Sequence, residues 1–156
     1  MRRTTTVLAL VALLALSTAC GAQKVCPPVA GANGIRVAVP PALQRLVGTL
    51  RLELCQGRRC SAVTFPTRAP AAGGPLAKGV QLVGGAFQVD LGRFGKGWKA
   101  STESGLTIIG SNRKGRIVLQ RTEQFTFDAT YPKSHGCTPV PALRHSTGVS
   151  GADLTG

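Results

Sequence analysis

Hydrophobic and charged residues alternate in the segment LRLELCQGRRC, and this pattern restricts the fold more than any other feature of the chain. Leu50, Leu52 and Leu54 fall at every second position, so an extended backbone would turn all three to one face. The polar tip QGRR separates this segment from a second one, CSAVTF, and a hairpin between them would place Cys55 opposite Cys60. The segment therefore predicts an antiparallel β-hairpin linked by a disulfide beside its tip.

Short segments with strand character recur as far as about residue 138. Besides the hairpin they are GIRVAVP, GVQLVGGAFQVDLG, GLTIIGSNRKGRIVLQR and EQFTFDATYP. The segment PALQRLVG has a proline at its start and predicts one or two helical turns. The pattern predicts an all-β fold, an Ig-like antiparallel β-sandwich of about seven strands with at most one short helix. A small β-barrel is the alternative, because strand spacing alone does not separate the two.

The N-terminal residues have the pattern of an export signal. Arg2 and Arg3 precede an apolar run from Val7 to Leu16 that is shorter than the about 20 residues needed to span a bilayer. The sequence LSTAC then ends in Cys20 and is similar to a lipobox, the signal for acylation of the cysteine and cleavage before it. Cleavage after Ala22 is the alternative, and it would release a secreted protein.

An acylated Cys20 predicts an extracytoplasmic protein anchored to the cell membrane. Two or more acyl chains give a stable anchor, and a basic mature chain would reinforce it on an anionic leaflet. The GAQKVCPPVAGAN stretch that follows is small and aperiodic, as is typical of a tether. The predicted divisions are a lipoprotein signal peptide (1–19), the lipid-bearing cysteine with a flexible tether (20–33), the β-sandwich domain (34–141) and a flexible C-terminal tail (142–156).

Four cysteines remain when Cys20 is set aside, and an even number in an exported chain indicates disulfides. Four cysteines allow three connectivities. The hairpin favours Cys55–Cys60, which leaves Cys26 to pair with Cys137 and to join the two ends of the domain. A zinc site formed by Cys55, Cys60, Cys137 and the nearby histidine would have the wrong spacing for the usual zinc motifs, so no metal is expected.

The net charge of +13 is high for 156 residues. Loss of Arg2 and Arg3 with the signal leaves 17 basic and 6 acidic residues, a net charge of +11. The basic residues are scattered, and none of the seven aromatic residues is interleaved with a basic stripe, so nucleic acid is not an expected partner. Outside the cytoplasm the anionic partners are lipid head groups and envelope polymers. The candidate binding residues are Arg93, Lys96, Trp98, Lys99, Arg113, Lys114 and Arg116.

Trp98 is the single tryptophan of the chain, and it has two interpretations. It would either fill the core or lie exposed, where it would contact a sugar ring or a membrane interface. No catalytic template fits the sequence. Glu53, Asp90 and Glu123 occupy strand positions that are expected to face solvent, and His135 and His145 lie near the C-terminal end with no acid close by in sequence. We therefore expect no enzyme activity, no catalytic residue and no cofactor.

The combination of LSTAC, GIRVAVP, LRLELCQGRRC and a late YPKSHGC resembles small actinobacterial lipoproteins with a single Ig-like or transthyretin-like β domain. The resemblance implies export, anchoring and a sandwich fold, and it brings no catalytic residues. The expected function is that of a non-enzymatic envelope lipoprotein whose β-sandwich serves interaction or structure. The alternative is a module that binds an anionic or carbohydrate envelope component through the basic turns and Trp98.

Overall fold

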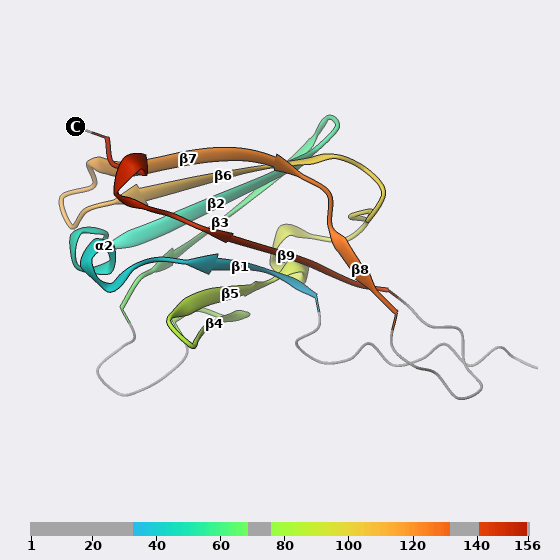
Figure 1. Cartoon of the computed structure of the whole chain (residues 1–156), viewed down its shortest axis with the longest axis horizontal. Coiled ribbons are helices and arrows are strands. Elements are labelled where there is room, and N and C mark those ends of the chain that lie inside the picture. Colours follow the sequence, from blue (N-terminus) through green and yellow to red (C-terminus); the bar gives the residue numbers. More distant parts are fainter. Residues whose placement is uncertain (1–32, 69–75, 132–140, 156) are drawn as a thin grey trace, which may run out of the picture.

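The computed structural model describes residues 33–68, 76–131 and 141–155. These residues form two β-sheets that pack face to face (Figure 1). The first sheet has the order β4 (Val80–Val83), β5 (Ala86–Asp90), β1 (Gly34–Ala38), β9 (Ala142–Gly148) and β8 (Asp128–Thr130). The second sheet has the order β3 (Arg59–Pro66), β2 (Thr49–Gln56), β6 (Ser104–Ser111) and β7 (Ile117–Phe125). The remaining elements are α2 (Pro41–Leu46) and the 3-10 turns η1 (Leu91–Phe94) and η2 (Gly151–Asp153). The predicted β-sandwich is confirmed, and the sheets do not close into a barrel.

The core lies between the inner faces of the two sheets. Leu50, Leu52 and Leu54 are fully buried at alternate positions of β2, as the sequence pattern predicts. Phe65 from the second sheet meets Phe87 from the first, with ring centroids 5.5 Å apart. Aromatic pairs of this kind contribute both buried area and specific geometry, so these two rings hold the sheets together.

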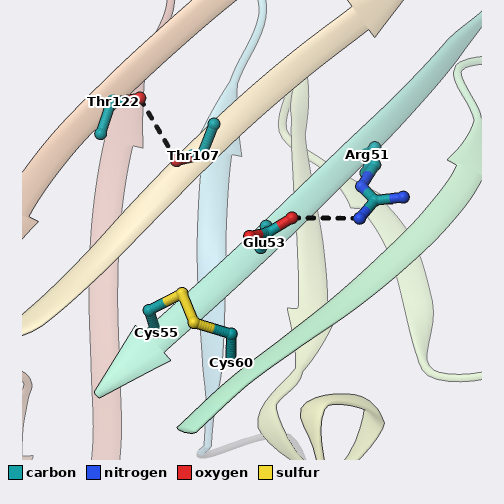
Figure 2. Close-up of a disulfide and its surroundings, with 6 residues drawn as sticks. All are labelled: Arg51, Glu53, Cys55, Cys60, Thr107 and Thr122. Carbon is teal, nitrogen blue, oxygen red and sulfur yellow. Dashed lines mark hydrogen bonds and ion pairs between the residues drawn. A yellow bond between two sulfur atoms is a disulfide. The ribbon is translucent and has the colours of Figure 1, made fainter. Parts of the chain in front are cut away.

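The predicted cysteine hairpin is present (Figure 2). Cys55 and Cys60 are opposite each other in the register of β2 and β3, and their sulfur atoms form a disulfide. Two residues form the turn, and Gly57 takes a positive φ of 60° there, which a side chain would disfavour. The hairpin tip is therefore defined by the turn and closed by the disulfide.

The C-terminal segment differs from the prediction of a flexible tail over 142–156. Its first residues form β9, which pairs in parallel with β1, so the sandwich is not entirely antiparallel. The following turn η2 begins with a capping box between Ser150 and Asp153, and Val149 is buried. The domain thus extends beyond 141 and has nine described strands rather than about seven.

Several predictions concern residues outside the described ranges. They are the signal peptide, acylation at Cys20 or cleavage after Ala22, the tether, and the Cys26–Cys137 disulfide. Within the described ranges, no helix has the length and apolar character required to cross a membrane.

Candidate functional site

The predicted binding residues form two groups at opposite ends of β6 (Figure 1). One group lies in the turn that joins β6 to β7: Arg113, Lys114 and Arg116. The other group follows β5, within η1 or after it: Arg93, Lys96, Trp98 and Lys99. The structure therefore does not bring all seven candidates to one surface, and each group has to be considered by itself.

A cleft of about 840 Å³ surrounds the first group. Arg45 of α2 and Arg68, just after β3, join the three predicted cations, although neither was predicted. The remaining lining residues are Leu46, Asn112, Val118, Leu154 and Thr155. Three segments that are distant in sequence thus bring five positive charges to one end of the sandwich. We call this depression the basic cleft.

Asn112 fixes the turn that carries three of the five cations. Its side-chain Oδ1 accepts hydrogen bonds from the backbone N–H groups of Lys114 (2.9 Å) and Arg116 (3.1 Å). Its backbone N–H donates to the carbonyl of Arg116 at 2.8 Å. Gly115 has a φ of 78°, which glycine adopts without the steric cost of a side chain. The turn is thus held by its own hydrogen bonds and presents its basic side chains to solvent.

Backbone hydrogen bonds tie the other two segments to this turn. The N–H of Gly48, which follows α2, donates to the carbonyl of Ser111 at 2.7 Å. The buried Thr67 donates its hydroxyl to the carbonyl of Val47, and its N–H donates to the carbonyl of Gly48 at 3.1 Å. A Cβ at position 48 would lie 3.3 Å from the backbone nitrogen of Arg113, so glycine permits this close approach. These contacts set the spacing of Arg45, Arg68 and the turn.

No acidic side chain lines the basic cleft, and all six acidic residues of the chain are among the described residues. The acid nearest in sequence to a lining residue is Asp153, which accepts a hydrogen bond from the Ser150 backbone and lies 3.8 Å from Arg121. Five like charges without a compensating carboxylate create a local positive potential. The cleft therefore has the electrostatic character of an anion-binding surface.

Lys96, Trp98 and Lys99 of the second group line a different hollow, and Arg93 is not among its lining residues. The tryptophan of this group is a core residue. Trp98 is only 9% exposed, and its Nε1–H donates to the carbonyl of Gly95 at 3.1 Å. The guanidinium of Arg59 lies 4.4 Å from its ring centroid. Asp90, Lys96 and Lys99 line this hollow, so its charge is mixed. The interpretation of Trp98 as an exposed anchor is wrong, because its ring is packed and its polar atom is already bonded.

Polar side chains between the sheets form a second cluster that sequence reasoning missed. Glu123 of β7 points toward β9, where it accepts hydrogen bonds from His145 Nε2 at 2.7 Å and from Thr147 Oγ1 at 2.8 Å. Arg121 also donates to it, at 3.1 Å. The prediction that Glu123 faces solvent is therefore wrong, and so is the placement of His145 in a tail. The His145 ring is also stacked on Phe125, with centroids 3.6 Å apart.

This environment changes the acidity of Glu123. Burial by itself would raise the pKa of the carboxyl group. The hydrogen bonds from His145 and Thr147 lower the pKa, and so do the bond from Arg121 and the positive charge of His145. The stabilising contacts prevail, and the pKa of Glu123 lies below its ordinary value of 4.5. The shared carboxylate of Glu123 joins β7 to β9. Thr147 donates its hydroxyl to this carboxylate and not to His145, so the two residues do not form a nucleophile–base pair.

The cysteine hairpin provides the one group with metal-ligand spacing in the described part of the chain. It consists of Glu53, Cys55 and Cys60 (Figure 2). The two sulfur atoms are bonded to each other, and the Glu53 carboxylate accepts a hydrogen bond from Arg51 at 3.0 Å. The oxidised hairpin therefore offers a metal a single carboxylate that is already paired.

Comparisons with known proteins do not identify a family. No protein-family profile matches the sequence, and no curated protein or solved structure matches it significantly. The interpretation of the basic cleft therefore rests on its own residues.

Proposed function

We propose that the protein is a lipid-anchored envelope lipoprotein whose β-sandwich binds an anionic component of the cell envelope through the basic cleft. The observation that carries this proposal is the convergence of five cations, with no acid, in one cleft. Backbone hydrogen bonds bring together cations from three segments that are distant in sequence. Basic residues that served only to keep the protein in solution would not need to be gathered in one cleft. The buried Trp98 argues against the alternative in which that residue binds a carbohydrate.

The anchoring part of the proposal rests on the LSTAC sequence. We expect the protein extracted from membranes to have the mass of a chain that begins at Cys20 and carries a diacylglyceryl group. Intact-mass spectrometry measures this directly, and it also reports whether the remaining four cysteines are oxidised. A mass that corresponds to a chain beginning after Ala22 would instead establish a secreted protein.

The binding part predicts a large effect of charge reversal in the β6–β7 turn. Changing Arg113, Lys114 and Arg116 together to glutamate should weaken binding to soluble polyphosphate by about 100-fold, because the cleft then repels the ligand. Isothermal titration calorimetry or fluorescence anisotropy measures the dissociation constant. Binding by the unchanged protein should also weaken as salt is added, because the contacts are electrostatic.

A second triple variant gives a matched control. Changing Arg93, Lys96 and Lys99 to glutamate alters the net charge by the same amount at the other end of β6. We expect the control to bind polyphosphate within a few-fold of the unchanged protein, since only long-range electrostatics change. Equal losses in both variants would mean that the affinity comes from net charge alone, and the basic cleft would not be a binding site.

A further inference from the structure

Two of the residues that line the basic cleft are exposed leucines. Leu46 of α2 is 54% exposed, and Leu154, just after η2, is 40% exposed. The structure fixes both positions: α2 is tied to the turn through Gly48, and Thr155, next to Leu154, donates its N–H to the carbonyl of Val118 at 3.1 Å. Large aliphatic side chains are therefore held in water among five cations.

This combination fits a lipid surface better than a soluble polyanion. Cations near an anionic bilayer are attracted to the head groups, while aliphatic side chains gain free energy by entering the acyl region. A hydrated polymer would use the positive charges but would leave both leucines exposed to water. The cleft matches an anionic membrane in charge and in apolar contact.

The chain before the sandwich is long enough for this end to reach the membrane in which Cys20 would be anchored. The described residues begin just before β1, and α2 follows the other end of this strand. The point where the described chain begins and the basic end of the sandwich therefore lie at opposite ends of β1 (Figure 1). Asn33 lies 13 residues after Cys20, and that length spans at most about 47 Å. β7, with nine residues, is the longest of the described strands and spans only about 30 Å. The tether therefore allows the basic end to turn toward the bilayer.

We propose that the end of the sandwich formed by α2, the β6–β7 turn and the C-terminal residues docks onto an anionic phospholipid membrane, with Leu46 and Leu154 entering the interface. This inference rests on the proposed anion-binding function and specifies its ligand as a lipid surface. It also gives the domain a fixed orientation, in which the cysteine hairpin, at the far end of β2, faces away from the bilayer.

Vesicle binding tests the inference with the mature chain from Gly21 onward. This chain carries no acyl group and retains every residue of both sheets. It should sediment with vesicles that contain phosphatidylglycerol and not with vesicles of phosphatidylcholine alone. The double variant Leu46→Gln/Leu154→Gln should bind the anionic vesicles about tenfold more weakly, a larger loss than for polyphosphate. The control Leu82→Gln/Val83→Gln removes aliphatic residues of similar exposure, 47% and 46%, from β4 and should bind the vesicles normally.

The outcomes separate this inference from the proposed function. Binding to polyphosphate but not to anionic vesicles would overturn membrane docking and leave anion binding in place, with a wall polymer as the ligand. Equal vesicle binding by the Leu46/Leu154 variant and the unchanged protein would also overturn it. Failure to bind either probe would reject both proposals, since both require the five cations.

Discussion

Replacing Phe87 with alanine should lower the free energy of unfolding by about 4 kcal/mol, the largest effect that we expect from a single substitution. Phe87 is fully buried in β5, and its ring meets that of Phe65 across the two sheets. Truncating this side chain creates a cavity between the sheets and also removes the aromatic contact with Phe65. Urea unfolding monitored by far-ultraviolet circular dichroism measures the change.

Leu82 provides a control from the same hairpin. It is directly opposite Phe87 in the register of β4 and β5 but is 47% exposed. Leu82→Ala should cost less than about 1 kcal/mol, because little apolar area is lost. Equal losses in the two variants would show that the contact between Phe65 and Phe87 does not stabilise the packing of the two sheets.

The coupling between Phe87 and Phe65 can be measured separately. Substituting each by alanine and then both gives a double-mutant cycle, and residues in contact should show a coupling of about 0.5–1.5 kcal/mol. A coupling near zero would mean that the two rings contribute only through the area that each one buries.

The sequence predicted those strands in which aliphatic residues alternate with polar ones. Leu50, Leu52 and Leu54 identify β2, because each inward position carries a leucine. β9 lacks that signal: its inward positions include Leu143, but also His145 and Thr147, which read as surface residues. They face inward because Glu123 gives them a partner across the sandwich. This partner is 22 residues from His145 and 24 from Thr147, so it leaves no mark in a local pattern.

The binding site could be predicted only in part for the same reason. Arg113, Lys114 and Arg116 are close in sequence and belong to a recognisable turn, so they were identified as candidates. Arg45 and Arg68 join them through contacts that depend on how α2 and the end of β3 pack, and neither residue belongs to a motif. Local patterns therefore indicate which residues can act, while the fold determines which of them act together.

Replacing Glu123 with alanine should lower the free energy of unfolding by about 3 kcal/mol at neutral pH. The substitution leaves His145, Thr147 and Arg121 without their shared acceptor, and the Glu123 side chain is only 17% exposed. Removing one member of a partly buried charged cluster costs more than removing a surface ion pair, because the remaining polar groups stay partly desolvated. The measurement is urea unfolding of both proteins.

Glu53 offers a closely matched control. Each glutamate accepts a hydrogen bond from an arginine two residues earlier on its strand, at 3.0 Å from Arg51 and 3.1 Å from Arg121. Glu53 lies on the outer face of the second sheet (Figure 2), where its side chain is 36% exposed. Glu53→Ala should therefore cost no more than about 0.5 kcal/mol. A loss equal to that of Glu123→Ala would show that the position between the sheets confers no special strength.

The contribution of Glu123 should also depend on pH. Because folding lowers its pKa below 4.5, the folded state favours the carboxylate, and the resulting stability is present at a pH above 4.5. It is lost as the pH falls through the lower pKa of the folded state, where the carboxyl takes up a proton. The difference in unfolding free energy between the unchanged protein and Glu123→Gln should therefore shrink as the pH falls below 4.5. A difference that grows in acid would mean that the contacts with His145, Thr147 and Arg121 do not stabilise the charged form.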